Sequence, residues 1–320
     1  MRSVRWADRI ERTNMFTVDD LRGSTRQRSR ERLMRHVFQA AAVTSVLISV
    51  LIMVVLFRGA FNFLSLIEWD LAKLSDTGWF PRRERFDLRT TIVGSVVMGA
   101  IAMIVAVPFG LGVAVYLSEY AHPRTRKILK PVIELLAGVP SVIVGYFVLR
   151  FIAPKIVAPL FDPTNNLNML AAGLGIGVLV IPIMASISED ALRSVPMALR
   201  EASYGVGARK INTVVKVVIP AAISGLVAAF IIAVSRAIGE TMVATMAGGF
   251  DGSGLYEGWQ PTNRGLTMTA AMTNAVGGTD QDVGGASFEV LYFVGAVLFL
   301  ITLGLNMIGN RVVGRIRERY

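Results

Sequence analysis

The chain has 320 residues, of which 53% are hydrophobic and 18% are charged, and its net charge is +10. Soluble domains average about 25% charged residues, so this composition indicates a membrane protein. Cysteine is absent and histidine occurs only twice, which excludes disulfides and thiolate metal sites and argues against a multi-histidine metal centre. We expect no metal site and no cofactor.

Residues 1–36 form a charged leader before the first apolar run. Residues 1–35 contain ten arginines together with acidic residues and few large apolar ones, which is typical of a solvated tail that touches anionic lipid headgroups. A nucleic-acid-binding arm is a weaker alternative. The leader is too long for the charged region of a signal peptide, and no small-residue cleavage site follows the apolar run. We therefore expect a cytoplasmic basic tail and, after it, a retained membrane anchor.

Six long apolar runs predict membrane-spanning helices, since a helix needs about 20 apolar residues to cross a bilayer. The runs are too long and too continuously apolar for barrel strands, and backbone groups in lipid must be paired within their own segment. We predict an all-α polytopic membrane protein. Residues 37–89 hold the first span and an extracytoplasmic loop, and residues 90–315 form the core. The six predicted spans are 37–57, 90–116, 128–152, 169–188, 217–247 and 288–308.

The basic residues predict the orientation, because lysine and arginine gather in cytoplasmic loops. With the N-terminus inside, the cytoplasmic segments hold 23 basic residues and the extracytoplasmic segments hold eight. The stretch "PRRERFDLR" at residues 81–89 argues locally for the opposite orientation. The wider count predicts that both termini face the cytoplasm. No internal repeat is visible, which indicates that symmetry around a pathway comes from a second subunit.

Local features modify two of these segments. Gly138 and Pro140 predict a helix break in the third run, which either lines a cavity or serves packing. Glu134 follows Lys130 by four residues, and we expect these two to pair near the cytoplasmic end of that run. Residues 266–274 are expected to form a short helix against the bundle.

The loop after the fourth run, residues 189–220, contains a helix-like segment, "ALREASYG", after a break at Pro196. Gly205 and Gly207 are suited to end that helix, because glycine tolerates the left-handed cap conformation. Apolar positions such as Leu199 are not needed inside the bilayer here. The segment therefore packs on something, either the chain's own bundle or another protein.

The segment "EASYGVGARKINTVVKVVIP" resembles the EAA loop of the permease subunits of ABC importers. Glu201, Ala202, Ser203, Gly207 and Pro220 occupy the motif positions, with serine in place of the usual second alanine. The resemblance implies the type I (MetI-like) importer permease fold. It also implies that this loop docks into a groove on a separate ATPase subunit.

Further segments resemble the phosphate-importer branch of that family: "PFGLGVAVYLSEYA", "IELLAGVPSVIVGYF", "ISEDALRSVPMALREASYGVGA", "SRAIGETMVATMAGG" and "LFLITLGLNMIGNR". Methionine after the Glu-Thr pair is similar to the PstC-type rather than the PstA-type permease. The resemblance covers residues 90–315. It implies the cytoplasmic (inner) membrane, a second PstA-like permease, two PstB-like ATPase subunits and an extracytoplasmic PstS-like phosphate-binding protein.

ATP hydrolysis is not expected in this chain. The sequence contains no G-x-x-x-x-G-K-[ST] motif, so it has no loop of that type to hold ATP phosphates. We expect no catalytic residues and no enzymatic activity, with hydrolysis in a partner subunit.

Arg236 and Glu240 interrupt the fifth apolar run, and on a helix their spacing places them on one face. An arginine at the centre of a membrane costs roughly 2.5–3.5 kcal/mol, so it normally faces a bundle interior or a pathway. Its planar fork matches two phosphate oxygens. Phosphate retains at least one proton near pH 7, and a carboxylate can accept a hydrogen bond from that protonated oxygen; sulfate has no such proton. The resemblance implies a transport role for both residues.

Other interpretations of these residues stay open. The pair is also explained as an intrahelical ion pair that fixes the span, or as two side chains that extend to the outer interface. Gly239 is expected to allow close approach of another helix, and Thr241 to add a hydroxyl to the pathway. We expect a permease that moves inorganic phosphate by alternating access. The alternatives are a permease for molybdate, tungstate or sulfate, a stand-alone secondary transporter or channel, and a non-transporting receptor.

Overall fold

The computed structural model describes residues 25–75, 78–163, 165–250, 252–253, 260–277 and 285–316. The chain divides into two compact units, Met1–Val55 and Leu56–Tyr320. The basic tail predicted for residues 1–36 lies outside the described residues as far as position 24. The described residues are helical almost throughout, as the apolar runs predict, and they include one two-stranded sheet.

The described part of the first unit belongs to a single helix, α3 (Thr25–Leu66), which continues into the second unit. Most apolar side chains of its described part up to Val55 are exposed, as illustrated by Leu47 at 62%. The stretch Leu33–Leu66 is long and apolar enough to cross a membrane. A helix that is apolar on all sides and not buried in protein is stable only against lipid.

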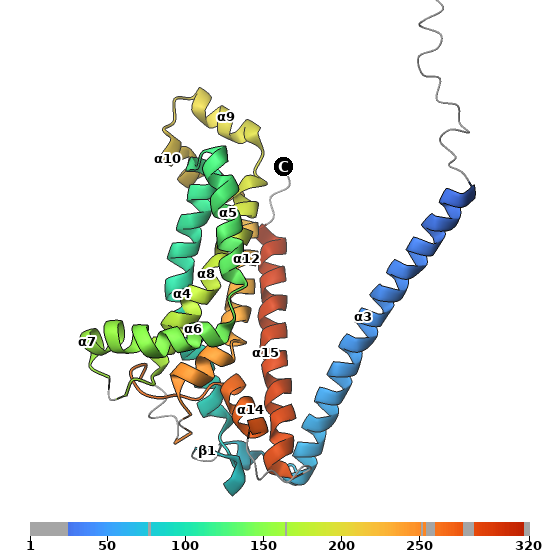
Figure 1. The fold of residues 1–320 in the computed structure, drawn as a ribbon, viewed down its shortest axis with the longest axis vertical. Helices are drawn as coiled ribbons and strands as arrows, with labels where there is room; N and C mark the ends of the chain where they lie inside the picture. The colour runs from blue at the N-terminus through green and yellow to red at the C-terminus, as the bar shows by residue number, and fades with distance from the viewer. Residues whose placement is uncertain are drawn as a thin grey trace, which may run out of the picture. The chain divides into compact units, whose positions relative to one another are not determined.

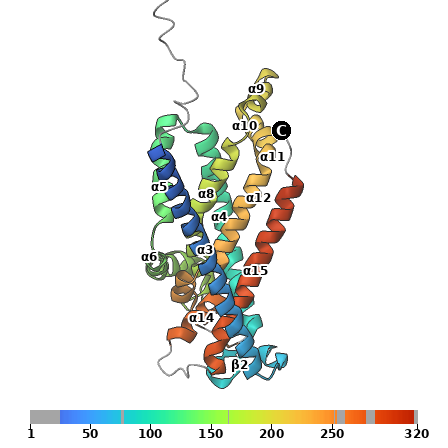
Figure 2. The ribbon, with the colours of Figure 1, turned by 90° about the vertical axis from the view of Figure 1, so that its right-hand side faces the viewer.

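The second unit is a helix bundle centred on α4 and α8 (Figures 1 and 2). Glycines of α8 allow close packing, since a Cβ on Gly177 would lie 2.9 Å from the carbonyl oxygen of Ala102 on α4. Small residues serve the same purpose in other membrane bundles, where backbones approach without a hydrophobic driving force. The main helices of the bundle are α4 (Leu88–Val115), α8 (Met169–Arg193), α12 (Ile223–Ile238) and α15 (Ala286–Ile316).

The bundle has two chemically different ends (Figures 1 and 2). At one end, here called the α9 end, lie α9 (Met197–Gly205), α10 (Lys210–Thr213) and the C-terminal end of α15. At the other, the α14 end, lies α14 (Met268–Gly277), which confirms the short helix predicted at 266–274. The α14 end also holds η1 (Leu71–Ser75), β1 (Trp79–Phe80), η2 (Pro81–Arg83) and β2 (Arg85–Phe86), with β1 antiparallel to β2.

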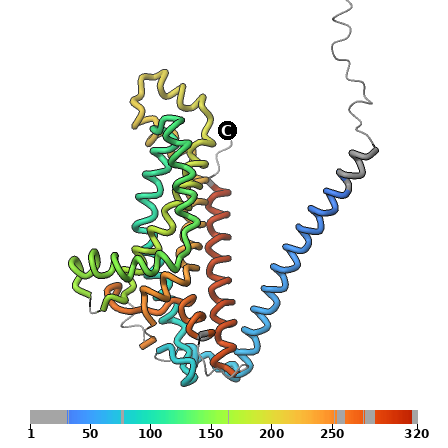
Figure 3. Tube along the Cα trace, viewed as in Figure 1, coloured from blue at the N-terminus to red at the C-terminus, as the bar shows by residue number. Residues whose placement is uncertain are grey.

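The third predicted span is broken at the predicted place, but its bounds of 128–152 are wrong. After α4, the π-helical turn η3 (Tyr116–Tyr120) leads to α5 (Pro123–Ala137), which runs along the bundle. Proline lacks an N–H and disfavours helical geometry in the residue before it, so Pro140 stops that helix. The chain then lies across the bundle (Figure 3) as α6 (Ser141–Phe147), η4 (Val148–Val157) and α7 (Ala158–Phe161).

The fifth predicted span is also interrupted. A bend of 72° separates the segment Lys210–Ala221, which includes η5 (Val214–Val218) and α11 (Ile219–Ala221), from α12. A non-helical break at residues 239–241 then separates α12 from the residues that lead into η6 (Ala244–Gly248). The described residues contain five helices able to cross a membrane, or six if the bent pair counts as one span. Six is the predicted number.

Candidate functional site

Arg236 and Glu240 lie where α12 ends and the chain turns toward η6. Arg236 is in the last turn of α12, Gly239 is its C-cap, and Glu240 follows outside the helix. The N–H of Gly239 donates to the Ser235 carbonyl at 3.1 Å, and the N–H of Glu240 donates to the Ala237 carbonyl at 3.3 Å. The sequence predicts that the two residues share one face of a helix. In the structure the helix ends between them, and their side chains still meet.

The two side chains form a short ion pair with unequal burial. Nη1 of Arg236 lies 2.6 Å from Oε2 of Glu240, and the side chains are 44% and 3% exposed, respectively. The guanidinium neutralises the buried carboxylate through Nη1. Because a guanidinium carries five N–H donors, further donors stay available on its exposed side.

Two other helices hold the turn in place. The hydroxyl of Thr269, in α14, donates to the backbone carbonyl of Glu240 at 3.0 Å. The backbone N–H of Met268 donates to Oγ of Ser95, in α4, at 2.9 Å. The break after α12 is thus fixed by hydrogen bonds from α14, which is itself bonded to α4.

Gly239 and Thr241 have local contacts at this turn. A Cβ on Gly239 would meet the carbonyl oxygens of Ser235 and Arg236, at 3.3 and 3.9 Å. Within the described chain, Gly239 therefore ends the helix. The close approach of a second helix, which the sequence predicts at this glycine, is not seen there. The hydroxyl of Thr241 donates to the Gly239 carbonyl at 3.4 Å. A pathway role for Gly239 and Thr241 stays a prediction.

The motif residues of the 189–220 loop form a short, sharply ended helix. Glu201 and Ala202 are exposed on α9, and Val206 just beyond it is 85% exposed. Gly207 has a φ of +81°, and its N–H donates to the Tyr204 carbonyl at 2.9 Å. This is the left-handed cap predicted for this glycine.

Ser203 and Pro220 have distinct structural positions in the same loop. The Ser203 hydroxyl lies 2.9 Å from Oγ1 of Thr213, a fully buried residue of α10. The serine that replaces alanine in the motif thus adds a polar link between α9 and α10. Pro220 lies in α11, just before the 72° bend.

A buried glutamate at the α9 end was not identified from the sequence. Glu189 of α8 is fully buried and pairs with Arg126 and Lys130 of α5, at 2.6 and 2.7 Å. Lys130 also contacts the exposed Asp190 at 2.7 Å. The predicted pair of Lys130 with Glu134 is wrong, since Lys130 bonds to α8 and Glu134 is exposed. The sequence did contain a signal for this contact, because acidic residues at the end of the fourth apolar run and basic residues near the start of the third can pair with each other.

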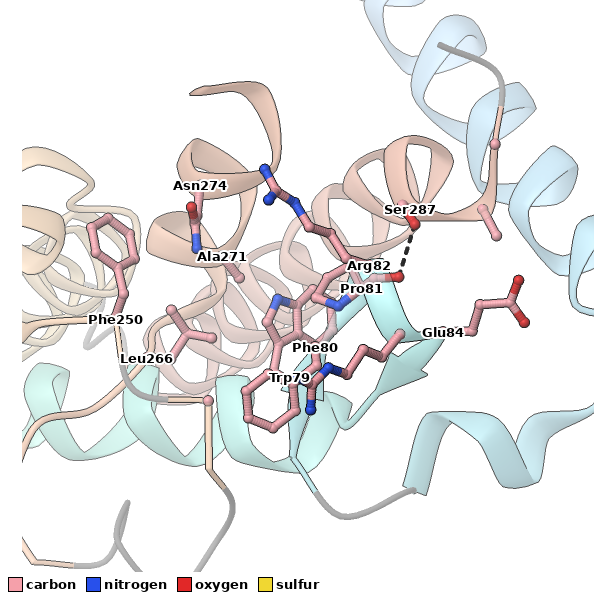
Figure 4. A pocket seen from close by; sticks show the side chains of 14 residues that line it. Trp79, Phe80, Pro81, Arg82, Glu84, Phe250, Leu266, Ala271, Asn274 and Ser287 are labelled. Carbon is pink, nitrogen blue, oxygen red and sulfur yellow. Dashed lines mark hydrogen bonds between the residues drawn. The ribbon is translucent and has the colours of Figure 1, made fainter. Parts of the chain in front are cut away.

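A pocket of about 810 Å³ opens at the α14 end (Figure 4). The N–H of Trp79 donates to the Gly252 carbonyl at 2.6 Å, and the Ser287 hydroxyl donates to the Pro81 carbonyl at 2.8 Å. These bonds join β1 to the loop after η6, and η2 to the start of α15. The lining combines aromatic, basic, acidic and amide side chains, including Trp79, Phe80, Arg82, Glu84, Phe250 and Asn274.

The sequence matches one protein family over two thirds of its length. The family described as "Binding-protein-dependent transport system inner membrane component" matches residues 106–320. The phosphate transport system permease protein PstC of Mesorhizobium japonicum is 31% identical over 299 residues, which cover 88% of this chain and 89% of that protein. PstC 1 of Mycobacterium tuberculosis is 35% identical over 246 residues, which cover 70% and 71% of the two chains.

A solved structure supports the fold alone. The MetNI methionine ABC transporter, in an inward-facing conformation, aligns with a TM-score of 0.53 and 20% sequence identity. The alignment covers 72% of this chain and 94% of that chain. The similarity agrees with the MetI-like fold predicted from the motif.

Proposed function

Because this chain belongs to the family of binding-protein-dependent transport system inner membrane components, we propose that it is the phosphate-translocating permease subunit of an ATP-driven importer. The names of its relatives in Mesorhizobium japonicum and Mycobacterium tuberculosis support phosphate as the substrate. The chain moves phosphate by alternating access. Hydrolysis of ATP takes place in a separate subunit, and the permease is not itself an enzyme.

The observation that carries the substrate assignment is the Arg236–Glu240 pair. Arg236 is partly exposed in this single chain, and its side chain offers a planar fork of donors. Phosphate oxygens bind this fork through charge-assisted hydrogen bonds. The Glu240 carboxylate accepts a hydrogen bond from the protonated oxygen of hydrogen phosphate. Gly239 and Thr241 complete this part of the pathway.

The partners follow from the two ends of the bundle. PstB-like ATPase subunits bind the loop around α9 through Glu201, Ala202, Ser203 and Gly207, with Pro220 setting the start of the next span. A second, PstA-like permease completes the pathway on the exposed side of Arg236. A PstS-like phosphate-binding protein docks at the α14 end, where the pocket provides aromatic and basic side chains.

We propose a side of the membrane for each end. The α9 end lies in the cytoplasm, together with both termini, and the α14 end lies outside the inner membrane. Residues 90–315 form the permease core, residues 37–89 supply the first span and an outer loop, and residues 1–36 are a cytoplasmic tail. The arginines of residues 81–89 lie at the outer end because they belong to a folded turn, in which Arg89 pairs with Asp87 at 3.4 Å.

Phosphate uptake by the complete transporter in vesicles tests the substrate site. Arg236→Lys should lower uptake roughly tenfold or more, because lysine keeps the charge and loses the bidentate fork. Glu240→Gln should lower phosphate uptake and make sulfate a better competitor, because glutamine does not test for the substrate proton. Arg150→Lys is the matched control: Arg150 is another exposed arginine in an apolar helix, and we expect uptake within about twofold of wild type.

The result separates the pathway site from a structural ion pair. Normal uptake by assembled Arg236→Lys and Glu240→Gln transporters would contradict the proposal that this pair binds the substrate. Loss of uptake with unchanged exclusion of sulfate would remove the proton-testing role of Glu240. Exchanging the two residues is a poor test, because an arginine at position 240 would be placed in a buried turn outside the helix whatever the substrate.

A further inference from the structure

Arg200 joins the docking helix α9 to two membrane helices at once. Its Nη2 lies 2.8 Å from Oε1 of Glu119, in the π-helical turn η3 that continues α4. The same nitrogen donates to the Leu192 carbonyl at 2.9 Å, and Nη1 donates to the Val195 carbonyl at 2.6 Å. Leu192 is in the last turn of α8, and Val195 lies two residues beyond the end of that helix. One side chain thus connects α9, α4 and α8.

The geometry of this contact makes it rigid. The side chains of Arg200 and Glu119 are only 10% and 5% exposed, so water does not replace their hydrogen bonds. The last carbonyls of a helix have no partner within the helix. Arg200 donates to one of them, that of Leu192, and to the carbonyl of Val195 just beyond the helix. A planar guanidinium can reach all three acceptors in a fixed arrangement, which a single ammonium nitrogen cannot reproduce.

Neighbouring contacts attach the loop around α9 to the end of α4. The Ser203 hydroxyl bonds to Thr213 and so ties α9 to α10. The ammonium of Lys210, in α10, lies 4.8 Å from the centre of the Tyr120 ring, in η3. The loop is therefore attached to the end of α4 at two points. Glu201 and Val206 remain exposed for a partner.

The attachment continues toward the Arg236–Glu240 pair. Ser95 of α4 accepts a hydrogen bond from the backbone of Met268. In the same helix, α14, Thr269 donates to the carbonyl of Glu240. We therefore expect a displacement of α4 at the α9 end to reach the turn that holds Glu240. The contacts that would carry it are those of Ser95 in α4 and of Met268 and Thr269 in α14.

We propose that Arg200 is the positioning residue that passes movement of the docking helix to α4 and α8. The inference rests on the proposed function, in which α9 is held by an ATPase subunit. Arg200 contacts neither substrate nor nucleotide. Its role is to make phosphate movement follow ATP hydrolysis, so its loss should separate the two activities.

The test measures phosphate uptake and ATP hydrolysis in the same vesicles, with the complete transporter. Arg200→Lys and Glu119→Gln should each lower the phosphate moved per ATP hydrolysed by about fivefold or more. The amount of copurified ATPase and the KM for phosphate should stay close to wild type. Arg193→Lys is the matched control, since Arg193 lies near the same helix end with a side chain 47% exposed, and its ratio should not change.

A covalent link provides the rescue. The chain contains no cysteine, so cysteines at positions 119 and 200 can be joined by a bifunctional thiol reagent, with cysteine-free partners. The double variant should have a low ratio of phosphate to ATP before the reaction and a raised ratio after it. The same reagent on the Arg200→Cys variant alone should change nothing.

The outcomes distinguish this inference from the proposed function. A merely structural role would lower uptake and hydrolysis together, so an unchanged ratio in Arg200→Lys and Glu119→Gln overturns the inference and leaves the importer intact. A low ratio that the link at positions 119 and 200 does not raise also overturns it. A wild-type complex without ATP-dependent phosphate uptake overturns the proposed function and this inference with it.

Discussion

Two neighbouring carboxylates on α8 show how burial sets the importance of a charge. Glu189 and Asp190 both contact Lys130 at 2.7 Å, but their side chains are 0% and 64% exposed. An exposed ion pair contributes little, because water and salt compete with it. A buried carboxylate depends on its partners, since without them its charge would be left unpaired in a medium of low dielectric constant.

We expect Glu189→Gln to destabilise the purified chain by about 1–3 kcal/mol, because it removes a charge that Arg126 and Lys130 both contact. The apparent melting temperature in detergent should fall by roughly 2–8 °C. Asp190→Asn is the matched control, and its effect should stay within about 0.5 kcal/mol. Equal melting temperatures for the two variants would show that the α5–α8 contact does not depend on the buried charge.

Single residues also show where sequence reasoning succeeds and where it stops. The spacing of Arg236 and Glu240 predicts their contact, because helical geometry brings such residues together. It does not predict that Glu240 leaves the helix, since the turn is held by Thr269, which is 29 positions away. Lys130 is the opposite case. A partner at the right local spacing, Glu134, loses to Glu189, which lies 59 positions away.

At the scale of elements, the loop around α9 depends on one glycine conformation. Gly205 and Gly207 both have free space where a Cβ would be placed, but only Gly207 has a positive φ, at +81°. A side chain in that left-handed conformation costs roughly 1–2 kcal/mol. Gly205 is helical, where alanine is favoured over glycine.

We expect Gly207→Pro to abolish binding of the ATPase while membrane insertion is retained, because proline cannot adopt a positive φ. Gly207→Ala should weaken binding, and Gly205→Ala should leave it unchanged or slightly improved. The measurement is the ATPase that copurifies with each variant from membranes that contain equal amounts of the chain. Full copurification with Gly207→Pro would contradict the assignment of this loop as the docking element.

Element positions are well predicted from apolar runs, and changes of direction are not. The bounds of α4, α8 and α15 include the predicted spans at 90–116, 169–188 and 288–308, apart from one residue at the end of α4. The chain changes direction before the transverse segment at 141–161 and again after α11, and at both places the sequence is apolar before and after the break. Hydropathy measures transfer into lipid and carries no information on the direction of a helix within it. Proline marks the first break, and the second follows Pro220 without a distinct local signal.

At the scale of the whole molecule, the second unit of the chain has two different ends, and the count of basic residues predicts which of them faces the cytoplasm. α9, α10 and the C-terminal end of α15 lie at one end of the bundle, and α14 and the small sheet lie at the other (Figure 2). By length and composition, the described residues give six candidate spans if the bent pair counts as one, and an even number of crossings would return the chain to the side on which it began. The distribution of basic residues then predicts that the α9 end faces the cytoplasm.

Because the chain has no cysteine, single cysteines report the orientation without background from this subunit. Lys127→Cys, in α5, and Arg315→Cys, near the end of α15, should react with a membrane-impermeant thiol reagent only in inverted vesicles. Ser253→Cys, at the α14 end, should react only in right-side-out vesicles. All three positions are exposed in the structure, so a failure to react would report the side of the membrane and not burial within this chain.

Reaction at positions 127 and 315 from opposite sides would contradict the arrangement of the bundle itself. A complete reversal of the three results would leave the bundle intact and overturn the orientation that the basic residues predict.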